Sequence, residues 1–84
     1  MTVNIVNLRP KPVPMEHRCS VGEAFRAPLQ VWRAGGNGEV EVPIGGIVVV
    51  LEVSEDGRWL RLLSPGGTTF RWAMDEVVGH WWRL

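Results

Sequence analysis

The chain has 84 residues, enough for one small domain, and nine Lys and Arg residues balance nine Asp and Glu residues. The formal net charge is zero, so bulk electrostatics would attract the chain neither to DNA nor to an anionic membrane. This argues against a histone-like coat on DNA and against a polybasic membrane anchor. The longest apolar run, residues 47–51, is too short to cross a bilayer, and the first residues lack the pattern of a secretory signal. We therefore expect a cytoplasmic protein with no membrane partner.

Residues 1–27 predict an N-terminal strand followed by an extended arm. Residues 2–8 open with alternating apolar and polar side chains, which is typical of a short strand. Alternate prolines then fix φ and favour polyproline II or another extended conformation: Pro10, Pro12 and Pro14. Residues 15–27 follow neither the helical nor the strand period, and they predict no more than a turn or a short helical piece.

Residues 28–84 predict a series of short strands. A strand over 29–32 ends in a glycine-rich turn, and a second apolar alternation follows at 40–42. Residues 47–54 are rich in β-branched side chains and predict a longer strand. Strict alternation would place one set of its apolar side chains on a common face: Ile47, Val49, Leu51 and Val53.

Two tight hairpins are predicted after this strand. Asp56-Gly57 joins it to a strand over 58–63, with Gly57 supplying a positive φ. The run Ser-Pro-Gly-Gly at 64–67 forms the next turn, before a strand over 68–72. Residues 73–77 are long enough for one helical turn, and 80–84 complete the chain as a short strand. The sequence therefore predicts an all-β fold of five to six strands with one short helical turn near the C-terminus.

A small barrel is the expected architecture, because a flat sheet of this size would leave two wet edges. The loop order is a strand, a long excursion, two tight hairpins, a helical turn and a closing strand, which is the order of an SH3-like barrel. An OB-like barrel is the alternative, although its strand order usually needs more residues between the third and fourth strands.

Three segments resemble bacterial SH3 domains, and the resemblance covers residues 28–84. Those domains typically show an L-x-V-R segment, a G-x-x-V-x-V-L-E strand and a G-W-x-x-V strand, and similar runs occur here at 29–33, 42–52 and 57–62. Residues 67–72 lie where the family has a G-x-x-G-W-V stretch, although Arg71-Trp72 replaces its Gly-Trp pair and Arg58 separates Gly57 from Trp59. The resemblance implies an SH3-like barrel and a tendency to bind extended polymers.

The tryptophans and two arginines are the candidate ligand-binding residues. Aromatic side chains grip polyproline ridges, stack on bases or hold sugars, and in SH3-like barrels one groove lies between the long loop and the helical turn. That resemblance implies a groove lined by Trp32, Trp59 and the outward-facing member of the pair Trp81 and Trp82. Arg61 and Arg71, on neighbouring strands, would be its polar neighbours. The alternative for each tryptophan is a place in the barrel core.

No enzyme, metal site or cofactor is predicted. His17 and the single cysteine, Cys19, have no second pair of ligands such as a zinc site requires. The acidic pairs at 55–56 and 75–76 stand where turn and helix-start chemistry already favours carboxylates. No catalytic residue follows from either pattern.

The sequence thus predicts a non-enzymatic binding module whose partner is a protein or an extended peptide. Nucleic acid ranks below a protein partner, because acidic residues offset the arginines along the strands. The alternative function is structural: an assembly protein that buries its Trp and Val-rich surfaces in a partner complex or in a homo-oligomer, the latter for instance through the N-terminal strand.

Overall fold

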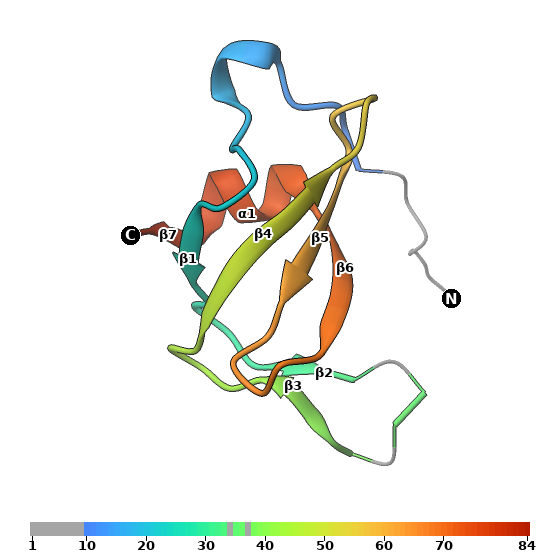
Figure 1. Ribbon diagram of the computed structural model, residues 1–84, viewed down its shortest axis with the longest axis vertical. Coiled ribbons are helices and arrows are strands. Elements are labelled where there is room, and N and C mark those ends of the chain that lie inside the picture. The colour runs from blue at the N-terminus through green and yellow to red at the C-terminus, as the bar shows by residue number, and fades with distance from the viewer. Residues whose placement is uncertain (1–9, 34, 37) are drawn as a thin grey trace, which may run out of the picture.

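The computed structural model describes residues 10–33, 35–36 and 38–84. Within them the chain forms seven strands in two antiparallel sheets and one short α-helix, α1 (Met74–His80) (Figure 1). The all-β fold with one short helix near the C-terminus is therefore confirmed. The strand predicted over residues 2–8 lies outside the described residues.

The main sheet has five strands in the order β6-β5-β4-β1-β7. One side of it is a meander of three strands joined by the two predicted hairpins: β4 (Ile47–Val53), β5 (Trp59–Leu63) and β6 (Thr69–Ala73). On the other side of β4 lie β1 (Ala24–Arg26) and then β7 (Trp82–Arg83). The two outermost strands, β6 and β7, are thus its edges.

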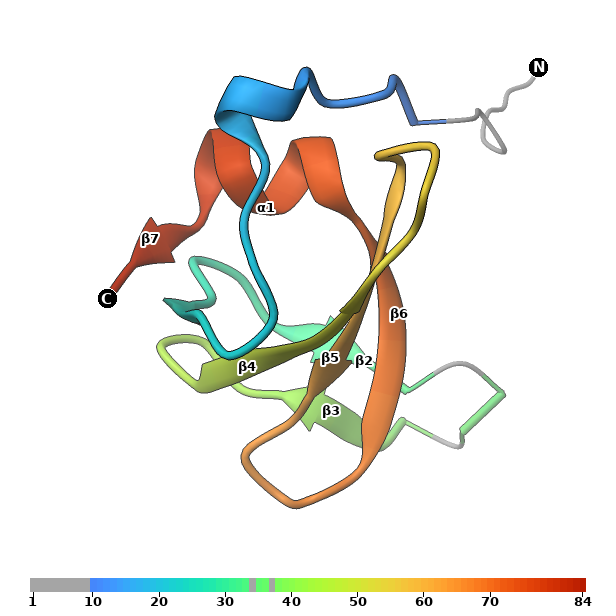
Figure 2. The ribbon, with the colours of Figure 1, turned by 45° about the horizontal axis from the view of Figure 1, so that its top comes forward.

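The second sheet is a small hairpin within the long excursion between β1 and β4. It pairs β2 (Val31–Trp32) with β3 (Val40–Val42), where the sequence shows alternating residues but does not predict the pairing. In Figures 1 and 2 this hairpin lies at the end of the main sheet that carries the β5–β6 turn, and α1 lies at the other end. A short 3-10 turn, η1 (Met15–His17), passes over α1 (Figure 2).

Strand β1 is the one element that the sequence pattern does not reveal. It is three residues long, and it falls in the segment 1–27 that the sequence assigns to an arm, so the main sheet includes residues of that segment. Its centre, Phe25, is fully buried. So short a strand carries no period, and pairing with β4 on one side and β7 on the other stabilises it instead.

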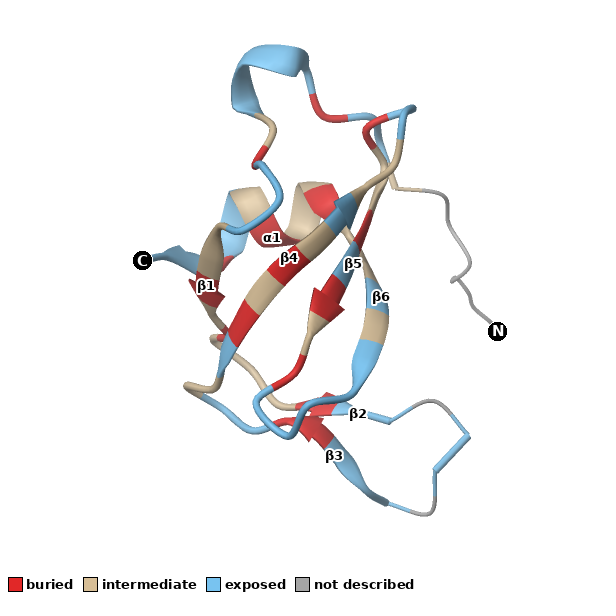
Figure 3. Ribbon diagram, viewed as in Figure 1, coloured by how far each residue is buried: buried red, intermediate tan, exposed pale blue. Residues whose placement is uncertain are grey.

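The core lies on the concave side of the main sheet, and buried residues alternate with exposed ones along β5 (Figure 3). Leu60 and Leu62 of β5 are buried and are paired with Trp72 and Phe70 of β6. Val48 and Val50 of β4, Phe25 of β1, and Met74 and Val77 of α1 complete its centre. Burial of each such side chain contributes about 1.5–3 kcal/mol, which explains how a domain without a disulfide holds together.

A β-bulge in β4 corrects the predicted alternation of that strand. The pairs Val49↔Leu63 and Val50↔Leu62 are followed by Glu52↔Arg61, so one extra residue, Leu51, stands between two registers. Val53 consequently pairs with Leu60 and packs against the core, so the prediction that it shares a face with Val49 is wrong. The same shift places Glu52 beside Arg61, on the convex face.

The proline-rich arm is attached to the β4–β5 turn through Gly57. The Val13 N–H donates to the Gly57 carbonyl at 2.9 Å, and Arg18 Nε donates to the Val13 carbonyl at 2.7 Å. Gly57 has φ 76°, as expected for the Asp-Gly turn, and a Cβ there would lie 2.7 Å from Arg18 Cζ. Glycine is thus favoured here by its backbone conformation, and a Cβ would in addition displace the guanidinium group of Arg18.

We predict that Gly57→Ala destabilises the fold more than Gly67→Ala. Both glycines have a positive φ, which costs an L-residue roughly 1–2 kcal/mol, but a Cβ at Gly67 would meet nothing within 4 Å. Only Gly57→Ala displaces the Arg18 guanidinium, and with it the hydrogen bond of Arg18 Nε to the Val13 carbonyl of the arm. Urea unfolding of both variants gives the difference, and equal losses of unfolding free energy would contradict the proposed role of Arg18.

Candidate functional site

The convex face of β5 and β6 brings together three of the predicted site residues. Arg61 and Arg71 are cross-strand neighbours, and the Arg71 guanidinium lies over the Trp59 ring, 4.4 Å from its centroid. Arg61 Nε pairs with Glu52 Oε1 at 2.8 Å, with both side chains more than half exposed. Two like charges side by side repel. Glu52 neutralises Arg61, and the Trp59 ring accommodates Arg71 through a cation–π contact.

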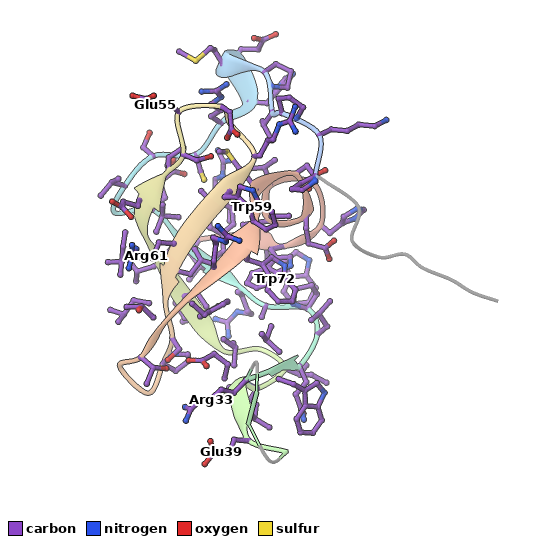
Figure 4. The ribbon with its side chains drawn as sticks, turned by 90° about the vertical axis from the view of Figure 1, so that its right-hand side faces the viewer. Arg33, Glu39, Glu55, Trp59, Arg61 and Trp72 are labelled. Carbon is purple, nitrogen blue, oxygen red and sulfur yellow. The ribbon has the colours of Figure 1, made fainter. Side chains whose placement is uncertain are left out.

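These residues line a pocket of about 600 Å³, called here the Trp59 pocket. Its walls come from the β4–β5 turn and from β5 and β6, and Figure 4 labels Glu55, Trp59 and Arg61 around it. The turn is stabilised by the Ser54 hydroxyl, which accepts a hydrogen bond from the backbone N–H of Trp59 at 2.9 Å and donates one to Asp56 Oδ1 at 2.7 Å. The Ser54 hydrogen bond, followed by that of the Arg58 N–H, lowers the pKa of Asp56 from its ordinary value.

Trp32 lines a separate pocket, of about 550 Å³, called here the Trp32 pocket. It lies between the β2–β3 hairpin and β6, and Phe70 and Trp72 of β6 line it. Trp32 is 58% exposed, so its ring is available to a ligand. Figure 4 labels Trp72 on β6, and Arg33 and Glu39 on the hairpin.

The wall of the Trp32 pocket is held in place by a buried carboxylate. Glu41 is 8% exposed; it accepts from Arg33 Nε at 3.2 Å and from the Thr68 hydroxyl. Thr68 in turn hydrogen-bonds Ser64 in the β5–β6 turn, with 2.8 Å between the hydroxyl oxygens. A buried charge requires such partners, so Glu41 connects the hairpin to the main sheet.

The structure does not bring all the predicted tryptophans into one groove. Trp81 is 5% exposed and packs on Trp72 in the core, with ring centroids 6.0 Å apart. Trp82 is 59% exposed on β7, at the opposite edge of the main sheet from β6. Alternation along the strand predicts this division between core and surface, but neither residue lines the Trp59 or the Trp32 pocket.

Sequence reasoning missed several residues of these two pockets. Phe70 and Thr69 of β6 line both, and Glu41 and Arg33 line the Trp32 pocket. Alternation along β6 could have identified Phe70 as an aromatic neighbour of Trp32 only if the position of the hairpin were known. Nothing in the sequence distinguishes Glu41, which is buried, from Glu39, which is exposed.

The described cysteine and histidines lie outside the two pockets. Cys19 is buried, and this burial, with a smaller contribution from Glu23, raises the pKa of its thiol. His17 is exposed on η1. Within residues 10–33, 35–36 and 38–84, no group of three His, Cys, Asp or Glu side chains could hold a metal ion. Over the same ranges, no helix has the length and apolar character needed to span a bilayer.

Comparison with known protein families, with curated proteins and with solved structures gives no match to this chain.

We predict that Glu41→Gln lowers the free energy of unfolding by about 1–3 kcal/mol, because the buried carboxylate loses the charge that binds the partly exposed Arg33 and the Thr68 hydroxyl. The matched control is Glu39→Gln, which removes an exposed partner of the same Arg33 and should cost less than about 0.5 kcal/mol. Chemical denaturation measures both. A control variant as unstable as Glu41→Gln would mean that burial of the carboxylate is not what matters.

We also predict a pH dependence at Asp56. Because its pKa is lowered in the folded state, the ionised carboxylate stabilises the fold above the ordinary value of 3.8, and this contribution is lost as pH falls through the folded pKa. Wild type should therefore be more stable than Asp56→Asn at pH 7, and the difference should vanish at low pH.

The control for this prediction is Ser54→Ala, which removes the largest cause of the shift. NMR titration of the Asp56 carboxyl group should give a pKa below 3.8 in the wild type and a higher value in the variant. An unchanged pKa in Ser54→Ala would refute the assigned cause.

Proposed function

We propose that this protein is a non-enzymatic binding module, built as an SH3-like barrel, that recognises an extended peptide at the Trp59 pocket. The observation that carries the proposal is the half-buried Trp59 ring, covered on one face by Arg71 and accompanied by Arg61 in a pocket of about 600 Å³. Aromatic and arginine side chains of this kind dominate the binding energy of many protein interfaces.

The order of elements supports the barrel part of the proposal. A long excursion containing β2 and β3 separates β1 from β4, and two tight hairpins join β4, β5 and β6. The short helix α1 and the closing strand β7 follow. The two hairpins, the helical turn and the closing strand follow in the order expected from the resemblance to bacterial SH3 domains, whereas the strand before the excursion is β1 instead of the expected residues 29–32.

The charges of the pocket favour a peptide over a nucleic acid. Its lining contains two carboxylates, Glu52 and Glu55, and two guanidinium groups, Arg61 and Arg71. A polyanion would be attracted by the arginines and repelled by the acids, whereas a peptide offers both signs of charge and apolar side chains.

Assembly is the second candidate function, and the β7 edge supports it. Trp82 and Leu84 are 59% and 61% exposed there, and an apolar patch at a sheet edge is a frequent contact between subunits. On this view the exposed tryptophans would be buried in a complex of several copies.

We expect the five indole N–H signals to separate these functions by NMR. An added peptide should shift the Trp59 signal, with Trp32 next, and should leave those of Trp81 and Trp82 in place. Trp59→Ala should weaken peptide binding about tenfold or more, which corresponds to about 1.4 kcal/mol. Single-stranded DNA and cell-wall fragments serve as competing ligand classes.

Trp82→Ala is the matched control, since it removes an equally large ring from the opposite edge. It should bind the peptide with unchanged affinity, and dispersed signals from the remaining indoles establish that each variant is folded. Sedimentation at the same concentration tests assembly. If no ligand moves the Trp59 signal, or if Trp82→Ala alone dissociates a large species, the peptide-binding function is refuted.

A further inference from the structure

Strand β6 is an edge of the main sheet, and its outer backbone groups lack a strand partner among the described residues. It pairs with β5 alone. Two flanking hydrogen bonds define the phase of that ladder: Ser64 N–H to the Thr68 carbonyl at 2.8 Å, and Met74 N–H to the Arg58 carbonyl at 2.9 Å. Successive residues of an antiparallel strand direct their backbone N–H and C=O groups to opposite sides. The backbone groups of Phe70 and Trp72 therefore hydrogen-bond to β5.

The residues between them therefore direct their N–H and C=O groups away from β5. These are Thr69 and Arg71, which are both exposed and lie about 6.6 Å apart along the strand. No described residue forms a backbone hydrogen bond with either of them on that side. An added antiparallel strand would find two donors and two acceptors at the correct spacing.

The two pockets lie on either side of this edge. Thr69, Phe70 and Arg71 of β6 line both the Trp59 pocket and the Trp32 pocket. The side chains of an added strand alternate between the two faces of a sheet. One set would enter the convex face, next to Arg71 and Trp59, and the other would enter the Trp32 pocket, next to Phe70 and Trp72.

The charges along β6 indicate which peptide side chains should lie on the convex face. Among the described ion pairs, Arg61 is matched by Glu52, whereas Arg71 has no carboxylate partner and only the Trp59 ring beneath it. An acidic side chain on the added strand would complete this pair. On the other face, the exposed Trp32 ring favours an apolar side chain.

We infer that the ligand is an extended peptide with alternating acidic and apolar residues, which adds to the outer edge of β6 as an antiparallel sixth strand of the main sheet. This inference rests on the proposed function and specifies its ligand and geometry. In this geometry, the peptide residues whose backbone pairs with Thr69 and Arg71 also direct their side chains to the convex face, next to Arg71.

That link gives a sharp test with the peptide acetyl-TEVEFET-amide. N-methylation of its glutamate residues removes the amides that pair with β6 and should weaken binding at least tenfold. N-methylation of its Val and Phe residues affects amides that point away from β6 and should change affinity less than threefold. In hydrogen exchange, the bound peptide should slow the amides of Thr69 and Arg71.

The charge is tested separately. Arg71→Gln should weaken binding of this peptide about tenfold and have little effect on acetyl-TQVQFQT-amide. The matched control is Arg83→Gln, an exposed arginine at the opposite edge, which should bind both peptides as the wild type does.

The outcomes distinguish the two proposals. If other peptides shift the Trp59 indole but TEVEFET shows no difference between the two methylation patterns, strand addition is wrong and the binding module stands. If no peptide shifts that indole, the module itself is refuted. If Thr69 and Arg71 are protected without peptide and the protection depends on protein concentration, the occupant is a second copy of this chain, and the peptide proposal is overturned.

Discussion

The burial of the Glu41 carboxylate is the polar interaction that joins the two sheets, beside the apolar contacts of Val31 and Val42 in the core. A charge removed from water needs close partners, and Arg33 and Thr68 provide them from the hairpin and from the β5–β6 turn. The β2–β3 hairpin pairs with no strand of the main sheet, so side chains alone hold it there: Val31 and Val42 enter the core, and Glu41 adds the polar contacts. Its position creates the Trp32 pocket and leaves the outer edge of β6 facing that pocket.

A second constraint acts on the convex face. The extra residue Leu51 in β4 changes the register, so that Glu52 lies opposite Arg61 and the apolar Val53 turns to the core. Without this shift, two adjacent arginines would share the face with no acid beside them. Arg71 alone is left to the Trp59 ring, which makes it both exposed and available for a partner charge. The proposed specificity therefore follows from a single inserted residue in the ladder.

Much of the fold follows from local patterns in the sequence. The Asp-Gly and Pro-Gly-Gly turns, the β-branched run of β4 and the helical turn before the last strand each have a local physical cause, and each was predicted near its observed position. Strand β1 was not, because three residues carry no period and their structure comes from two neighbours far away in the sequence. The grouping of Trp59, Arg61 and Arg71 needed only the strand register. The separation of Trp32 from them needed the position of the hairpin.

The sequence by itself determined most of the strands, that one of Trp81 and Trp82 is in the core and the other on the surface, and that Arg61 and Arg71 lie on neighbouring strands. These depend on backbone periods and tight turns, which act over a few residues. Only the tertiary structure decided which carboxylate is buried, where β4 bulges and which strand edge stays open. Those outcomes depend on strand pairing and desolvation between segments tens of residues apart. No local pattern shows that Glu41 is buried and Glu39 exposed, or that β6 is left as an open edge.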